Sequence, residues 1–241
     1  MPYILRIENN RSKAERIAYP YNIPSIFHLE KFVFRKPVTF IVGENGTGKS
    51  TFIEAIAVQA GFNPEGGSRN FNFSTKNSHS ALFEDIKLIR GTRRFKDGYF
   101  LRAESFYNVA SELDQLYEGD RGRLERAYGG SLHECSHGES FLALMHNRLS
   151  GTGLYIFDEP ESALSVSSQL NMMVRIKELV NQESQFIIAT HSPILLAYPD
   201  AEIYQVTKEG MKRIAYEDTD QFRLTKLFMN NYQRILNELE L

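Results

Sequence analysis

Blocks of apolar and polar residues follow one another along the chain and predict strands and helices in alternation. The runs LYIF (154–157) and FIIA (186–189) are continuous and apolar, as in strands that are buried on both faces of a sheet. The segments 82–90 and 98–103 predict strands on either side of a turn signal at 96–98 (KDG). Further strands are predicted at 31–42 (one or two strands), 202–206 and 212–216, the last two as a hairpin.

Apolar side chains at helical spacing predict helices between these strands. The predicted helices span residues 50–60, 106–116, a stretch that begins near 138, 166–180 and 219–239. Gly61 is the expected stop of the first helix, and residues 61–80, rich in Gly, Asn and Ser, predict a loop with at most a short alternating strand. The alternation indicates an α/β fold with a mostly parallel central sheet flanked by helices. We expect one domain, residues 1–241, with residues 62–135 as a small antiparallel and helical region inside it.

Composition places the chain among ordinary globular proteins. Its 241 residues are 42% hydrophobic and 24% charged, and the net charge of −2 gives no general electrostatic argument for binding nucleic acid. The single cysteine, Cys135, cannot form a disulfide within the chain, which fits a reducing cytosol. The N-terminus becomes polar too early for a secretory signal, and no apolar run approaches the roughly 20 residues that span a bilayer. We therefore expect a cytoplasmic protein without a membrane span.

A glycine loop, GENGTGKS (43–50), separates a predicted strand from a predicted helix. A triphosphate must be met at close range by many backbone N–H groups, which favours residues without a Cβ, and the helix adds its positive end. Lys49 would supply a point charge to the β and γ phosphates, and the Ser50 hydroxyl would be a ligand of Mg²⁺. The predicted nucleotide-binding residues are Gly43, Glu44, Asn45, Gly46, Thr47, Gly48, Lys49, Ser50 and Thr51. The loop predicts binding of ATP or GTP together with Mg²⁺.

Two carboxylates follow the apolar strand in LYIFDEPE (154–161). Ligands bind at the carboxyl ends of parallel strands, so Asp158 and Glu159 are expected beside the nucleotide. Asp158 fits the acidic residue that holds Mg²⁺, and Glu159 is then placed to orient or deprotonate the attacking water. Two carboxylates after a strand are otherwise often the solvated start of a helix, and the glycine loop is what favours the catalytic interpretation.

Two further motifs are open to more than one interpretation. His191 in ATHSP (189–193) follows the second apolar strand, where it would reach the γ-phosphate or the attacking water, although a single histidine is more often structural. The motif SHGES (136–140) opens a predicted helix, and its Ser136, Gly138 and Glu139 would either bind a phosphate or only cap that helix.

The order of these motifs, GENGTGKS, SHGES, LYIFDEPE, SALS and ATHSP, resembles that of an ABC-type ATPase. The resemblance makes them the Walker A loop, the signature loop, Walker B with its glutamate, the D-loop and the switch histidine. The chain is similar to the soluble branch with SMC heads, RecF and OLD-type ATPases, because Ser192-Pro193 follows the histidine and the signature is SHGES. It also resembles small stand-alone predicted ATPases that share YPYNIP, GFNPEGG and FLRAES, and it lacks the heptads of SMC arms.

The resemblance implies a soluble Mg-dependent ATPase that works as a head-to-tail dimer with ATP between the subunits. Lys49, Ser50 and Asp158 would bind Mg–ATP in one subunit, Glu159 and His191 would be catalytic, and the partner's signature loop would complete the site. The implied process is DNA maintenance or defence, with a separate effector protein as a further partner. Two alternatives stay open: the ATP-binding subunit of an ABC transporter, and a nucleotide-gated protein-binding module with negligible turnover.

The sequence departs from the family pattern after residues 98–103. A glutamine is expected there, but the chain has Arg102-Ala103-Glu104-Ser105, so Glu104 is the candidate contact to Mg²⁺ or water, with a purely structural role as the alternative. The aromatic residue that stacks on adenine in transporters would be Tyr19 or Tyr21, unless both only pack.

A basic stretch gives the one local argument for nucleic acid. It holds Lys87, Arg90, Arg93, Arg94 and Lys96 around a predicted turn. Such a cluster either contacts DNA phosphates or is a solvated hairpin.

Overall fold

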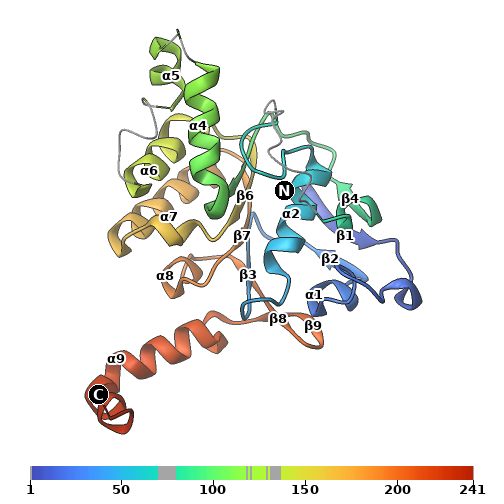
Figure 1. The fold of residues 1–241 in the computed structure, drawn as a ribbon, viewed down its shortest axis with the longest axis vertical. Coiled ribbons are helices and arrows are strands. Elements are labelled where there is room, and N and C mark those ends of the chain that lie inside the picture. Colours follow the sequence, from blue (N-terminus) through green and yellow to red (C-terminus); the bar gives the residue numbers. More distant parts are fainter. Residues whose placement is uncertain are drawn as a thin grey trace.

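The computed structural model describes residues 2–69, 80–117, 119, 121–128, 130 and 137–240 (Figure 1). Its main element is a six-stranded sheet in which five strands are parallel and the last, at one edge, is antiparallel. The strand order is β5 (Asp97–Arg102), β6 (Gly153–Asp158), β7 (Gln185–Ala189), β3 (Val38–Val42), β8 (Glu202–Thr207) and β9 (Gly210–Ile214). All residues of β3, β6 and β7 are buried, as their apolar runs predict. The predicted α/β fold with a mostly parallel sheet is confirmed.

A second, antiparallel sheet of three strands lies beside the first. Its order is β2 (Lys31–Val33), β1 (Ile4–Asn9) and β4 (Ile86–Arg90). The predicted small antiparallel region therefore exists, but two of its three strands come from the first 33 residues and not from residues 62–135. Strand β1 was not predicted, because ILRIEN has no strict alternation of apolar and polar residues.

The two strands predicted at 82–90 and 98–103, on either side of one turn signal, do not pair with each other. Residues 82–85 form a short helix, α3 (Leu82–Asp85), and the strand that follows joins β1. Strand β5 instead pairs in parallel with β6 at the edge of the central sheet. Asp97 lies in the predicted turn but is the first residue of β5. Its carboxylate accepts hydrogen bonds from Arg148 and from Tyr155 of the neighbouring strand β6.

Helices cover both faces of the central sheet (Figure 1). Helix α2 (Lys49–Ala60) packs between the two sheets, with the short helices α1 (Pro24–Phe27) and α3 nearby. The opposite face carries α4 (Phe106–Leu116), α5 (Arg121–Tyr128), α6 (His137–Asn147), α7 (Val166–Asn181) and α8 (Pro193–Leu196). Each face has its own cluster of buried apolar side chains.

Helix α2 ends as predicted. Gly61 takes a left-handed conformation with φ +97°, and its N–H donates to the carbonyl oxygen of Val58. The four other predicted helices are also present, with ends within about three residues of the predicted bounds. The hairpin predicted from residues 202–216 is formed by β8 and β9.

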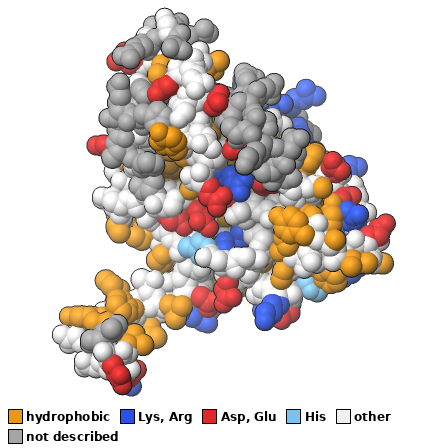
Figure 2. Space-filling view, viewed as in Figure 1, with side chains coloured by type: hydrophobic (Ala, Val, Ile, Leu, Met, Phe, Trp, Pro, Cys, Tyr) orange, Lys and Arg blue, Asp and Glu red, His pale blue; other side chains and the backbone are white. Residues whose placement is uncertain are grey.

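The C-terminal helix α9 (Asp220–Glu238) extends away from the rest of the molecule (Figure 1). Thr219 caps its first turn by accepting a hydrogen bond from the N–H of Phe222. The helix has no buried residue, and apolar side chains such as Leu227 and Met229 are exposed along it (Figure 2). Among the residues that the structure describes, no helix has both the length and the apolar character that crossing a membrane requires.

Candidate nucleotide site

The predicted motifs meet at the carboxyl ends of three neighbouring strands. β3 leads into the glycine loop, β6 ends at Asp158, and β7 ends at Ala189, two residues before His191. The parallel register places Ile41 and Asp158 each beside Ala189, so the three strands end at the same level. Acidic, histidine and basic side chains gather there near the middle of the face seen in Figure 2.

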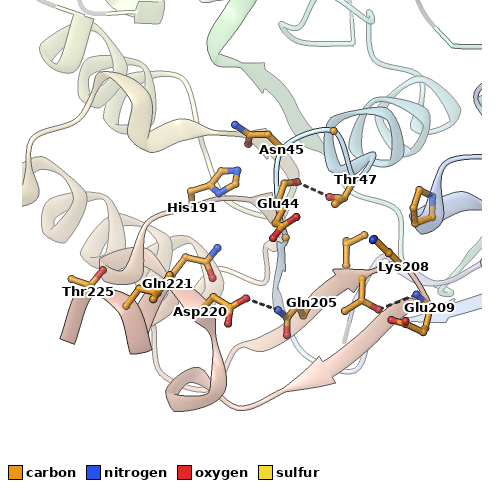
Figure 3. Close-up of a pocket in the computed structure, with 16 residues that line it drawn as sticks. Glu44, Asn45, Thr47, His191, Gln205, Lys208, Glu209, Asp220, Gln221 and Thr225 are labelled. Atoms are coloured by element: carbon orange, nitrogen blue, oxygen red, sulfur yellow. Dashed lines mark hydrogen bonds between the residues drawn. The ribbon is translucent and has the colours of Figure 1, made fainter. Parts of the chain in front are cut away.

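The glycine loop is closely packed from behind. Gly48 has φ +91°, and a Cβ on it would lie 2.4 Å from both Ile23 Cγ2 and Ser25 Oγ, so helix α1 leaves no room for a side chain. Glu44 bends the loop by accepting a hydrogen bond from Thr47 Oγ1 at 2.7 Å on its carbonyl oxygen. Gly43, Glu44, Asn45, Gly46 and Thr47 all border an open cleft (Figure 3). The loop thus presents its backbone to the cleft, as a phosphate cradle requires.

Lys49 is folded into this loop. Its side chain is only 4% exposed, and Nζ donates to the carbonyl oxygens of Gly43 and Glu44, each at 2.8 Å. Burial lowers the pKa of Lys49, while the nearby carboxylates of Glu159 and Asp158 oppose that shift. The two carbonyl oxygens that hold the ammonium group are uncharged, so its positive charge is available to an anionic ligand in the same loop.

Ser50 and Asp158 form a pair of hard oxygen donors beside Lys49. Ser50 Oγ donates to Asp158 Oδ1 at 3.2 Å across the start of α2, where Thr51 is the next, half-buried residue. Asp158 is 5% exposed, and burial raises its pKa to about 6 although Arg102 and Ser50 act in the opposite direction. A hydroxyl and a carboxylate next to a phosphate cradle are ligands that suit Mg²⁺, which takes most of its other ligands from water and the phosphates. Ser50 and Asp158 therefore fit the Mg²⁺ that the sequence predicts.

Asp158→Asn is expected to stabilise the nucleotide-free protein by about 1–3 kcal/mol at pH 7. The pKa of Asp158 in the folded state, about 6, lies above its ordinary 3.8, so the folded state binds the proton more tightly. Stability is then lost as pH rises from about 4 through 6, and an uncharged amide avoids that loss. Urea unfolding between pH 4 and 7 should show the advantage of the variant shrinking toward pH 4.

Asp97→Asn is the matched control for this prediction. Burial alone would raise the pKa of Asp97, but the charge and hydrogen bond of Arg148 at 2.7 Å outweigh it, and the net pKa is lowered. The amide should therefore destabilise the protein at pH 7. An Asp158→Asn variant that is less stable than wild type at pH 7 would contradict the prediction.

Glu159 and His191 lie next to each other, just after the ends of β6 and β7. Glu159 has φ +52°, a left-handed conformation that costs a non-glycine residue about 1 kcal/mol or more. Its N–H donates to the Ala189 carbonyl oxygen at 3.0 Å, which fixes the strained residue to the end of β7. Glu159 Oε1 is 3.6 Å from His191 Nε2, and this nitrogen is buried without a hydrogen-bond partner in the described part of the chain. Both side chains are about two-fifths exposed, and His191 lines the cleft.

Glu161 is a site residue that sequence reasoning missed. Its Oε1 accepts a hydrogen bond from the backbone N–H of His191 at 2.5 Å and so links the turn after β6 to the turn after β7. Pro160 starts this single 3-10 turn, Pro160–Ala163, and thereby directs Glu161 to the neighbouring strand. The sequence does show a third carboxylate, Glu161, in the stretch DEPE. Its contact with His191 depends on β6 and β7 being neighbours in the sheet, which the sequence does not show.

The cleft has a volume of about 1040 Å³ and a wall that the sequence did not predict (Figure 3). Opposite the glycine loop it is lined by the β8–β9 turn, 207–209, and by Gln221, Leu224 and Thr225 of α9. Gln205 Nε2 donates to Asp220 Oδ2 at 3.1 Å and ties the start of α9 to β8. Helix α9 is therefore both a projecting arm and a wall of the candidate site.

Neither tyrosine considered for adenine stacking borders this cleft. Tyr21 is buried, donates a hydrogen bond to Asp85 and lies under the guanidinium group of Arg11, 4.0 Å from the ring centre. These contacts make Tyr21 a packing residue, while Tyr19 is exposed.

Arg102, the last residue of β5, lies beside the Ser50–Asp158 pair. The Glu104 side chain is 85% exposed and lies 3.5 Å from Arg102 Nη2. Arg102 is mostly buried, with Nε 3.9 Å from Asp158 Oδ2. The contact of Glu104 with Mg²⁺ or water stays a prediction.

Of the predicted signature residues, Gly138 and Glu139 do not line the cleft. Ser136 is outside the described residues, and Gly138 and Glu139 belong to the first turn of α6. No described residue of α6 lines the cleft. Their predicted role therefore depends on a second copy of the chain.

The basic stretch is partly engaged within the chain. Arg93 forms an ion pair with Glu183, and Arg90 Nη2 donates to the carbonyl oxygen of Gln59 at 3.2 Å. These contacts favour the solvated surface over a dedicated nucleic-acid patch.

Residues 22–234 match the protein family described as "AAA domain". An uncharacterized ABC transporter ATP-binding protein of Haemophilus influenzae is 27% identical over 190 residues, 71% of this chain and 70% of that protein. The hemin import ATP-binding protein HmuV of Idiomarina loihiensis is 28% identical over 200 residues, 75% and 74% of the two chains. The solved structure of cbiO1 from Clostridium perfringens, part of the ABC transporter complex cbiONQ, is similar with a TM-score of 0.50 at 15% identity, with both chains covered in full. The fold is that of an ABC ATP-binding cassette.

Proposed function

Because this chain belongs to the AAA domain family, we propose that it is a Mg²⁺-dependent ATPase of ABC type whose two copies close around ATP. The observation that carries the proposal is the meeting of Lys49, the Ser50–Asp158 pair and the Glu159–His191 pair at one edge of the sheet. These groups have the separate tasks of holding phosphates, holding a metal and activating water.

Binding rests on the glycine loop and its lysine. The ATP phosphates replace the two carbonyl oxygens that now hold Lys49 Nζ, and the backbone N–H groups of the loop hold the phosphate oxygens. Ser50 and Asp158 would hold Mg²⁺, and the bound metal would neutralise part of the negative charge on the phosphates.

Hydrolysis rests on Glu159 and His191. The Glu159 carboxylate orients a water molecule and accepts its proton, and its strained backbone keeps it at the end of β6. His191 Nε2, which has no hydrogen-bond partner among the described residues, donates to the γ-phosphate. The Glu161 side chain keeps the histidine turn in place by accepting a hydrogen bond from the His191 backbone N–H. ADP and phosphate are the products.

The proposed dimer explains why α6 is remote from the cleft. A head-to-tail arrangement would bring the first turn of α6, with Gly138 and Glu139, over the glycine loop of the partner subunit, and Ser136, which precedes α6 in the sequence, is proposed to contribute there as well. ATP then bridges the two copies, and its hydrolysis releases them.

A mixture of two inactive variants tests this arrangement. Gly138→Arg places a long charged side chain on the first turn of α6 and should block closure, while arginine is compatible with the helix. Lys49→Ala should lose nucleotide binding in its own cleft. Each variant alone is expected to lose ATP hydrolysis, whereas mixed dimers regain one intact composite site and a measurable part of the wild-type rate.

Nucleotide binding separates the two variants in this test. Gly138→Arg should bind ATP as a monomer with nearly wild-type affinity. Normal ATP hydrolysis by Gly138→Arg alone would overturn the assignment of the signature loop.

A second candidate is the ATP-binding subunit of an ABC transporter. The names of the Haemophilus influenzae and Idiomarina loihiensis relatives favour it. We infer the soluble branch instead because Ser192 and Pro193 follow the histidine, where Ser192 Oγ caps α8 and also donates to Gln169. Co-purification with a membrane permease would favour the transporter.

A binding module with negligible turnover is the third candidate. The strained Glu159 beside His191 favours hydrolysis over it, because a pure switch does not need a base for water. The proposal includes no nucleic acid, since Arg93 and Arg90 of the basic stretch are engaged within the chain.

A further inference from the structure

Arg102 is the centre of an ionic cluster beside Asp158. Its Nη1 is 2.6 Å from Glu54 Oε2, its Nη2 is 3.5 Å from Glu104 Oε2, and its Nε is 3.9 Å from Asp158 Oδ2. The Arg102 and Glu54 side chains are 22% and 9% exposed. Arg102 Nε is buried and has no hydrogen-bond partner among the residues that the structure describes.

The backbone fixes this arrangement. Arg102 and Asp158 are directly paired residues of the neighbouring parallel strands β5 and β6. Glu54 lies one turn after Ser50 on α2, and its other oxygen accepts a hydrogen bond from the Ser80 N–H at 2.9 Å. The guanidinium group is thus held at one end by Glu54 while its Nε faces Asp158.

We propose that Arg102 is a resident cation of the nucleotide site, which partly neutralises Asp158 before the metal arrives and which competes with Mg²⁺ afterwards. The inference rests on the proposed function, because it takes Asp158 as the residue that holds the metal. It assigns a positioning role within residues 102–105, the stretch where the family pattern has a glutamine that this chain lacks.

The physical reason is the sign of the charge. A cation about 4 Å from a carboxylate in a partly buried setting attracts a metal-free ATP anion and repels Mg²⁺. Arg102 should therefore strengthen ATP binding without metal and weaken the extra gain in affinity that Mg²⁺ provides. The ratio of the dissociation constants for ATP in EDTA and in Mg²⁺ measures this gain.

Arg102→Gln is expected to raise that ratio about 5- to 20-fold above wild type. Most of the rise should come from weaker binding in EDTA. The ratio is measured by titrating a fluorescent, non-hydrolysable ATP analogue in EDTA and in saturating Mg²⁺. Arg102→Lys keeps the charge and should stay within about threefold of wild type.

Glu54→Gln changes the ratio in the opposite direction. Without the Glu54 carboxylate, Arg102 is free to pair with Asp158, and one negative charge near the metal is lost. Both effects make Mg²⁺ less favourable, so the ratio should fall. This variant keeps the proposal testable if Arg102→Gln does not fold.

Arg148→Gln is the matched control. Arg148 is also 22% exposed and pairs with Asp97 at 2.7 Å, at the other end of β5. The loss of this ion pair should lower stability and leave the ratio unchanged.

An unchanged ratio in Arg102→Gln, or an equal weakening of binding with and without Mg²⁺, overturns the resident-cation role. These outcomes differ from a failure of the proposed function. If wild type binds no nucleotide in Mg²⁺, the proposed ATPase itself is wrong; if wild type binds and only the ratio fails to respond, the inference about Arg102 alone is wrong.

Discussion

Glu159→Gln is expected to turn a transient association of two copies into a stable ATP-bound dimer. The amide keeps the shape of the side chain but cannot accept the proton of water, a role that contributes about 10²–10⁴-fold to rate. Ser50 and Asp158 still hold the metal and Lys49 still holds the phosphates, so ATP binds and persists. Because ATP is proposed to bridge the subunits, its persistence should hold them together.

Light scattering measures this effect directly. With Mg–ATP the variant should show a stable mass near twice 27.7 kDa, and this mass should fall when ATP is removed. Glu217→Gln, at an exposed glutamate outside the cleft, is the control and should behave as wild type does.

Two outcomes test the mechanism in which two copies close around ATP. A Glu159→Gln variant that binds nucleotide and stays monomeric at high protein concentration refutes it. If the free protein is already dimeric, crosslinking between positions 47 and 138 should occur only between copies and only with ATP. Crosslinking that is independent of ATP would contradict closure around the nucleotide.

Lys49→Ala is expected to weaken nucleotide binding by about 100-fold or more. Lys49 is the basic side chain that the glycine loop itself holds, and its Nζ already lies against the loop carbonyls. Alanine leaves the phosphates to the backbone donors alone. The fold should persist, because the substitution removes a buried charge whose pKa is lowered mainly by burial.

A titration with a fluorescent ATP analogue, together with thermal unfolding, measures both parts of this prediction. Lys177→Ala removes an exposed lysine of α7 and should leave the affinity unchanged. Wild-type affinity in a folded Lys49→Ala variant would contradict the assignment of the phosphate loop.

The sequence by itself determined the local parts of this protein. The apolar runs of β6 and β7, the helix α2 and its stop at Gly61 lie where the pattern predicts them. Each of these depends on burial or backbone conformation within a few consecutive residues, which is what a sequence pattern encodes. The glycine loop is local in the same sense, since Gly48 must be left-handed to start α2.

Only the tertiary structure decided how these parts meet. Strand β4 pairs with the N-terminal β1 and strand β5 with β6, although both strands flank one turn signal. Pairing between distant strands is set by which buried faces and ion pairs they satisfy together, and no short stretch of sequence contains that information. The positions of Arg102 beside Asp158 and of Glu161 beside His191 follow from this register, as side chains far apart in the chain become neighbours only when the strand order is fixed.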